Sequence, residues 1–147
     1  MAKSTLIKSR QAAFLAQGGR CFYCDHPMWV SEPENFSHRF AIRHAHLWRF
    51  QCTAEHLVPR EIGGRDTREN IVSACAYCNR QRHRPKRVRD PVQHRAHVLR
   101  QLAQGRWHPT TTRRRDYACF EMVRSGQTMN PSGGPNCVIL PGVTSNR

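Results

Sequence analysis

The chain of 147 residues carries 24 Lys and Arg against 10 Asp and Glu, which gives a formal net charge of +14. This length allows one compact domain with some trailing sequence and excludes large architectures such as (β/α)₈ barrels. So basic a chain favours a polyanionic partner, with nucleic acid first. No apolar run approaches the roughly 20 residues of a membrane span, and charges interrupt the N-terminal residues where a signal peptide needs an apolar core. We therefore expect no membrane partner and a cytoplasmic protein.

The predicted elements begin with a helix over residues 4–17, which has a rough apolar stripe and ends at Gly18 and Gly19. Residues 26–36 are predicted to form a loop, because they contain two prolines and an asparagine. Residues 40–54 look extended, with apolar side chains alternating over their second half.

A loop over residues 59–69 precedes a short apolar strand at residues 71–74. Helix-compatible sequence covers residues 77–83, and the Asp-Pro pair at 90–91 can cap and start a last helix that ends near residue 105. This order of elements predicts three parts along the chain. They are an N-terminal helix in residues 1–20, a domain over 21–108, and a flexible basic tail over 109–147 that is rich in Gly, Pro and Ser.

The seven cysteines are an odd number, which argues against a disulfide scaffold and for thiols that stay reduced. Four of them form two CxxC pairs, Cys21 with Cys24 and Cys75 with Cys78. Two such pairs supply the four thiolates that a structural zinc ion takes, and they clamp together two distant segments of a small domain. The remaining Cys52, Cys119 and Cys137 are interpreted as small apolar side chains or tail thiols.

The residues between and after these pairs form an ordered series. It consists of Glu55-His56, Gly63-Gly64, Asn70 and, directly after the second CxxC, Asn79. Over residues 21–84 the series resembles the zinc-knuckle branch of the HNH endonucleases. The resemblance implies an α+β fold, in which a small zinc-stabilised strand–loop–strand–helix unit, the ββα-metal or His-Me finger, has flanking helices.

Phosphodiester hydrolysis needs a base for water, compensation of phosphate charge and help for the leaving oxygen. His56 suits the base because neutral imidazole accepts a proton near pH 7. A divalent ion, Mg²⁺ or another such as Mn²⁺, would act as the Lewis acid. Its expected ligands are Glu55, a hard oxygen donor, with Asn79 and His83, which project from one face of a helix. Asn70 is expected to hold the finger loop and orient His56.

Other interpretations of these residues stay open. Asn70 could be a turn residue, Asn79 could cap the helix after the knuckle, and His83 could contact a phosphate. Glu55 departs from the Asp that is more usual at this position in the family. The His-Ala-His sequence at residues 44–46 lacks a third ligand, so it is interpreted as surface near nucleic acid and predicts no second metal.

A run of cations follows the second CxxC pair with no acidic residue inside it, as expected of a surface that binds several phosphates. The residues predicted to contact nucleic acid are Arg80, Arg82, Arg84, Lys86 and Arg87. Phosphate contacts position a duplex but carry no base code, so no sequence preference is predicted. A purely solubilising patch is the simpler alternative.

The sequence therefore predicts an HNH endonuclease that hydrolyses DNA with one divalent ion and a structural Zn²⁺. By resemblance, its products carry 5′-phosphate and 3′-hydroxyl ends, and its setting is a bacterial or phage-infected cell. Two alternatives remain: a zinc-knuckle module that binds nucleic acid without turnover, and a subunit of a larger phage or defence complex. A homodimer is one simple route to a double-strand break.

Overall fold

The computed structural model describes residues 2–108, with side chains from residue 4 onward. These residues fall within one compact unit, Met1–Thr111. The predicted tail at 109–147 lies outside the described residues. Within the described part of the chain, no helix is long and apolar enough to cross a membrane.

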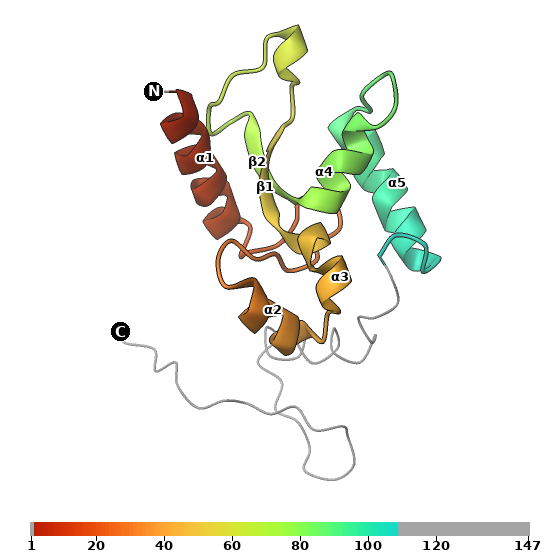
Figure 1. Cartoon of the computed structure of the whole chain (residues 1–147). Coiled ribbons are helices and arrows are strands. Elements are labelled where there is room, and N and C mark those ends of the chain that lie inside the picture. The colour runs from red at the N-terminus through yellow and green to blue at the C-terminus, as the bar shows by residue number, and fades with distance from the viewer. Residues whose placement is uncertain (1, 109–147) are drawn as a thin grey trace. The chain divides into compact units, whose positions relative to one another are not determined.

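An antiparallel hairpin lies at the centre of the fold (Figure 1). Strand β1 (Cys52–His56) pairs with β2 (Ile71–Cys75) in a register that sets Cys52 opposite Cys75 and His56 opposite Ile71. The predicted strand at 71–74 is confirmed. The loop between the strands contains one short 3-10 helix, η2 (Arg60–Ile62).

Helices cover the hairpin from two sides (Figure 1). Helix α1 (Ala2–Ala16) confirms the predicted N-terminal helix and packs on both strands. Just after it, the Gln17 side chain forms a pair of hydrogen bonds with the backbone of Ser73, one of 2.8 Å to the carbonyl and one of 2.9 Å from the amide. These bonds satisfy polar groups on the outer edge of β2. On the other side lies α4 (Ala76–His83), which begins directly after β2 and also confirms its prediction.

Helix α5 (Pro91–Ala103) begins as predicted, because the Asp90 carboxylate accepts hydrogen bonds from the amides of Val92 and Gln93. Of its buried residues, Val98 belongs to the main core, and His94 packs against the core residues Tyr23 and Trp107. That core consists of the four CxxC cysteines together with Tyr23, Met28, Cys52, Ala74, Val98 and Trp107. The thiols therefore lie at the centre of the domain.

The prediction for residues 26–54 is wrong over much of its length. Two helices, α2 (Pro33–Phe40) and α3 (His44–Leu47), and the 3-10 helix η1 (Trp48–Phe50) occupy it, and extended structure begins only at β1. Pro33 starts α2 instead of breaking it, because a proline in the first helical turn loses no internal hydrogen bond. The helices are fixed by a second apolar cluster made of Phe36, Ile42, Leu47 and Phe50.

Candidate functional site

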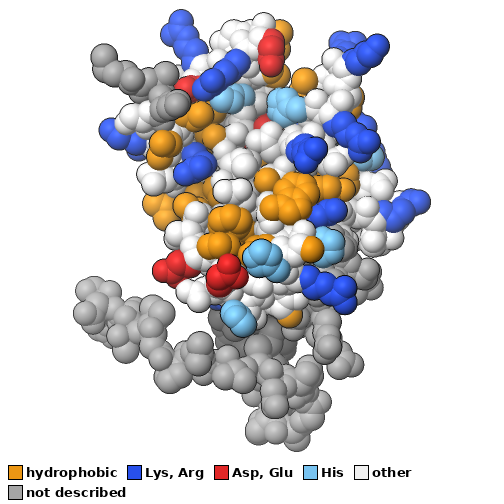
Figure 2. Space-filling model, viewed as in Figure 1, with side chains coloured by type: hydrophobic (Ala, Val, Ile, Leu, Met, Phe, Trp, Pro, Cys, Tyr) orange, Lys and Arg blue, Asp and Glu red, His pale blue; other side chains and the backbone are white. Residues whose placement is uncertain are grey.

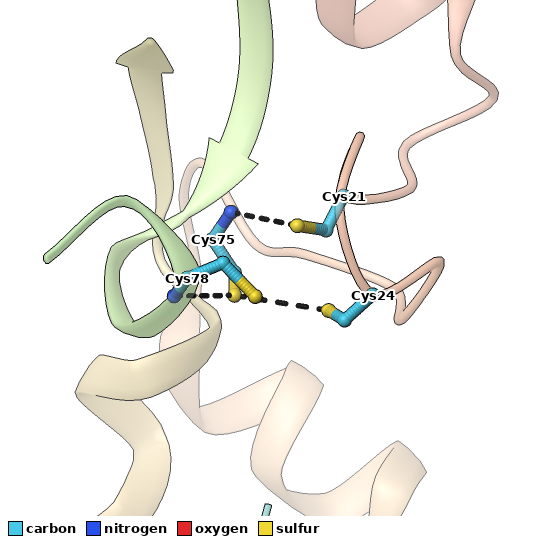
Figure 3. A group of neighbouring side chains, drawn as sticks. All are labelled: Cys21, Cys24, Cys75 and Cys78. Carbon is cyan, nitrogen blue, oxygen red and sulfur yellow. Dashed lines mark hydrogen bonds between the residues drawn. The ribbon is translucent and has the colours of Figure 1, made fainter. Parts of the chain in front are cut away.

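Four buried cysteines converge between the hairpin and the loop that follows α1 (Figure 3). Cys21 and Cys24 come from that loop, Cys75 ends β2, and Cys78 lies in the first turn of α4. Their Sγ atoms all lie within 4.8 Å of one another, and those of Cys24 and Cys75 are 3.9 Å apart. Ligands on a tetrahedral zinc with bonds of about 2.3 Å would be about 3.8 Å apart, so the four thiols fit this ion.

The surroundings of the thiols suit a charged metal–thiolate centre. Backbone amides of Tyr23 and Cys75 donate to Cys21 Sγ at 3.4 and 3.3 Å, and Trp107 Nε1 donates to Cys78 Sγ at 3.2 Å. At Cys21, burial acts to raise the thiol pKa, but hydrogen bonds with the other three thiols outweigh it, so the pKa is lowered. Burial, followed by hydrogen bonds with the other thiols, raises the pKa of Cys24 and Cys78, so a thiolate is favoured at Cys21 and metal binding would displace the protons of the other two.

His26 and His108 lie beside Cys24, and the ligand atoms of all three come within 4.8 Å. Because Cys24 already belongs to the four-cysteine cluster, this trio is not a separate site. Burial lowers the pKa of His108 to about 3, which keeps the ring neutral. His108 Nε2 lies 3.5 Å from Cys24 Sγ, and a neutral ring with its proton on Nε2 can donate a hydrogen bond to that sulfur.

The second group of functional side chains lies at the end of β1. Glu55 is 1% exposed and receives hydrogen bonds on Oε1 from Arg82 Nη1 and from the Tyr23 hydroxyl at 3.1 Å. Burial, followed by the charge of Glu55, raises the pKa of Tyr23, so Tyr23 remains a neutral donor. His83 Nε2 lies 3.2 Å from both carboxylate oxygens. Oε1 is thus held by Arg82 and Tyr23, whereas Oε2 faces only His83 among the described residues.

Asn79 and His83 lie one helical turn apart in α4, and the side chains of both face β1. Asn79 Nδ2 donates to Thr53 Oγ1 at 3.0 Å and to the Ala54 carbonyl at 3.1 Å. Its carbonyl oxygen accepts no hydrogen bond from the described residues. The His83 side chain is 35% exposed, so this end of α4 is open to solvent.

His56 points to the loop between the strands, where it forms a triad with two residues that the sequence did not single out. Its Nε2 lies 2.8 Å from Asp66 Oδ1, and Arg60 Nη2 holds both Asp66 oxygens at 2.7 and 2.8 Å. The bond from His56, and then those from Arg60, lower the pKa of Asp66. An ionised carboxylate can only accept, so Nε2 carries the proton. Because Nε2 is protonated, it cannot accept a hydrogen bond from Arg60 Nε, which lies 3.2 Å away.

Asn70 ties the two ends of that loop together. Its Oδ1 accepts from the Val58 amide at 2.8 Å, and its Nδ2 donates to the carbonyls of Val58 and Arg65 at 3.1 and 2.9 Å. Gly64 is needed beside this contact, because a Cβ at that position would overlap the Val58 carbonyl. The geometry agrees with the loop-holding part of the expectation for Asn70, whose side chain forms no hydrogen bond with His56.

The run of cations after the knuckle divides into two kinds. Arg80, Arg84, Lys86 and Arg87 are exposed, and Lys and Arg side chains gather on this side of the molecule (Figure 2). Arg82 is 1% exposed, and besides Glu55 it donates to the carbonyls of His56, Leu57 and Arg89. The expectation that Arg82 contacts nucleic acid is therefore corrected, because all its donors face the interior.

Sequence reasoning missed the partners of the predicted residues. Tyr23 lies between the two cysteines of the first CxxC, and the motif is interpreted from the cysteines alone. Asp66 and Arg60 lie in a loop whose sequence has no periodic pattern. Their roles depend on contacts across the hairpin, so no local pattern indicates them. For Arg82 the sequence predicted the wrong environment, because an arginine within a run of cations is usually exposed to solvent.

Residues 41–85 match the family model described as HNH endonuclease. This segment contains β1, β2 and α4, with every residue from Glu55 to His83, so the resemblance to the HNH endonuclease family is confirmed over residues 41–85. The domain combines helices with a two-stranded sheet, as the α+β prediction stated. Cys21 and Cys24 lie outside the matched segment and are joined to it by the fold. No curated protein and no solved structure gives a significant match to the chain.

Proposed function

We propose that this protein is a metal-dependent endonuclease that hydrolyses phosphodiester bonds in DNA. The observation that carries the proposal is the contact of Glu55 with His83 near the end of an HNH hairpin, with Asn79 one helical turn before His83 and with a histidine held by a carboxylate next along the strand. A purely structural hairpin has no need of this combination of donors at one solvent-accessible end.

His56 acts as the general base in this mechanism. Asp66 accepts a hydrogen bond from the protonated Nε2 of His56, which leaves Nδ1 as the unprotonated nitrogen. Nδ1 has no hydrogen-bond partner among the described residues. A fixed tautomer of this kind is what a base needs to remove a proton from water. Asp66 is thus a positioning residue, and Arg60 holds Asp66 in place.

The residues that would hold the divalent ion are Glu55 through Oε2, His83 through Nε2 and Asn79 through its amide oxygen. Ligand atoms about 2.1 Å from an octahedral Mg²⁺ lie about 3 Å apart, and Glu55 Oε2 and His83 Nε2 are 3.2 Å apart, so the pair fits. When bound, Mg²⁺ or Mn²⁺ supplies a Lewis acid at the phosphate. Arg82 neutralises Oε1 and keeps the carboxylate oriented.

The four cysteines hold a structural Zn²⁺ in this proposal, and the exposed cations bind the DNA backbone. Arg80 lies in the helix that carries Asn79 and His83, and Arg84, Lys86 and Arg87 follow that helix, so phosphates bound there lie next to the site. Asn70 keeps the loop that carries Asp66 closed against β1.

A zinc-knuckle module that binds DNA without turnover is the second candidate. The Glu55–Arg82 ion pair favours it, because a carboxylate already neutralised by arginine attracts a metal ion less strongly. A chain that binds DNA but never cuts it would support this candidate.

Supercoiled plasmid distinguishes the two candidates. Wild-type protein with added Mg²⁺ or Mn²⁺ is expected to give nicked or linear DNA, and none without the added ion. His56→Ala should lower the cleavage rate by at least about 10²-fold while DNA binding persists. His38→Ala, an exposed histidine in α2, is the matched control and should cut normally. Cleavage by His56→Ala at the wild-type rate would contradict the assignment of the base.

A further inference from the structure

An aromatic side chain lies exposed just before β1, at the other end of that strand from Glu55 and His56. Trp48 in η1 is 40% exposed, and among the described residues it is the only aromatic one in the set of exposed large apolar side chains. Tyr77 of α4 supports it edge-on, with ring centroids 6.3 Å apart and planes at 66°. Figure 2 shows hydrophobic side chains in the middle of this face, with Lys, Arg and His around them.

Two arginines lie against these rings. The Arg49 guanidinium is 4.3 Å from the Tyr77 ring centroid and 5.6 Å from that of Trp48, and Arg80 is 5.9 Å from Trp48. None of the ion pairs among the described residues includes either arginine. Arg49 Nε is buried without a hydrogen-bond partner. Their charge is therefore not neutralised by a carboxylate within this part of the chain.

We propose that Trp48, Tyr77, Arg49 and Arg80, here called the aromatic–arginine platform, bind an unpaired nucleobase of DNA. The base stacks on Trp48, and the arginines bind the flanking phosphates. Every base has a π-face, so such a platform accepts any of the four, but a base inside an intact duplex cannot reach it. The proposal rests on the proposed nuclease function and names its substrate class, DNA that contains unpaired nucleotides.

The contacts within the platform do not prevent stacking. Contacts between an exposed cation and an aromatic ring are worth less than base–aromatic stacking, by about a factor of two in free energy. A base can therefore displace an arginine from the Trp48 ring. The displaced guanidinium gains a phosphate in exchange, which is a stronger, charge-assisted partner.

Both segments that carry the platform, η1 and α4, lead along the chain to residues of the candidate site. Arg80 directly follows Asn79 in α4. Trp48 lies just before β1, which ends at Glu55 and His56, and the four residue steps from Cys52 to His56 span about 13 Å. A strand bound at both ends of β1 would hold an unpaired base only a few nucleotides from the phosphate at His56.

Binding of two matched probes tests the platform. The full-length protein, with no Mg²⁺ or Mn²⁺ added, is titrated into a short labelled DNA single strand and into the duplex of the same sequence and length. Trp48→Ala should weaken single-strand binding by about tenfold and duplex binding by less than about twofold. Trp48→Phe, which keeps a π-face, should retain most single-strand binding. Ile7→Ala removes a similarly exposed apolar side chain from α1 and should change neither.

Equal losses for both probes, or no loss, would overturn the platform. Thermal unfolding of each variant shows whether a loss reflects unfolding, and Trp48→Phe carries the test if Trp48→Ala does not fold. Plasmid cleavage by the same wild-type preparation separates this proposal from the nuclease proposal. Cleavage without a Trp48 effect overturns only the platform, whereas a selective Trp48 effect without cleavage supports the platform and counts against the nuclease.

Discussion

Arg82 lies within a run of exposed cations, yet the fold takes its guanidinium into the interior. There it donates to Glu55 and to the carbonyls of His56, Leu57 and Arg89, which joins the end of β1 to the segment after α4. Each buried group is satisfied, and this is the condition under which a buried ion pair is tolerated. Arg82 therefore sets the position of both Glu55 and the backbone beside His56.

Replacement of Arg82 by Met should strongly destabilise the domain. Glu55 would remain buried without its cation, and the loss of one partner of a buried pair costs about 3–5 kcal/mol. Urea unfolding followed by circular dichroism measures this change. Arg80→Met, on the same helix but exposed, is the control and should change the free energy of unfolding by less than about 1 kcal/mol. Similar losses for the two variants would show that the Arg82 pair has no special structural role.

At the scale of the elements, the four thiols bring together two segments that are far apart in sequence. Cys21 and Cys24 follow α1, whereas Cys75 and Cys78 join β2 to α4. His94 and Val98 from α5 pack on this centre, and burial lowers the pKa of His94 to about 4, which keeps it neutral there. A core built this way has few apolar contacts to replace the metal.

Loss of one of the four cysteine ligands should both prevent zinc binding and unfold the domain. Cys78→Ser is expected to lower the zinc content from about one ion per chain to near zero and to abolish the cooperative thermal transition. Cys52→Ser is the matched control, because Cys52 is also buried but bonds to Ser73 outside the cluster. Zinc content by mass spectrometry and thermal unfolding check both variants. A Cys78→Ser protein that keeps its zinc and its melting temperature would contradict the structural site.

The elements differ in how far their sequence predicted them. The hairpin strand at 71–74, the helix after the knuckle and the last helix carry local signals, such as the Asp90 cap, and all three are confirmed. The segment from residue 33 to 51 was missed, since its helices are short and depend on packing between Phe36, Leu47 and Phe50. Tertiary packing of this kind overrides local propensity.

The candidate site shows the same division. Spacing placed Asn79 and His83 on one helix face, and the fold brings His83 to Glu55. The contacts of Asp66 with His56, and of Arg82 with Glu55, join residues 10 and 27 positions apart. Such partners are chosen by the geometry of the folded hairpin, so a single sequence contains no pattern that identifies them.

At the scale of the whole molecule, a net charge of +14 attracts any polyanion. The contribution of particular cations to DNA binding must therefore be separated from that of the overall charge. The exposed cations Arg84, Lys86 and Arg87 lie just beyond α4, next to His83. If they bind phosphates, each contact releases counterions from DNA. Removal of one such cation then makes the negative slope of log affinity against log salt shallower by about 0.9. The salt dependence of binding therefore counts the contacts that this segment makes.

Two triple variants with the same loss of charge test this count. Replacement of Arg84, Lys86 and Arg87 by Ala should weaken duplex binding and lower the salt slope by about 2.7. Replacement of Lys8, Arg39 and Arg43, which are exposed on α1, on α2 and before α3, should leave the slope nearly unchanged. Anisotropy titrations over a series of salt concentrations measure both. Equal effects would mean that overall charge, rather than the segment beside His83, attracts the DNA.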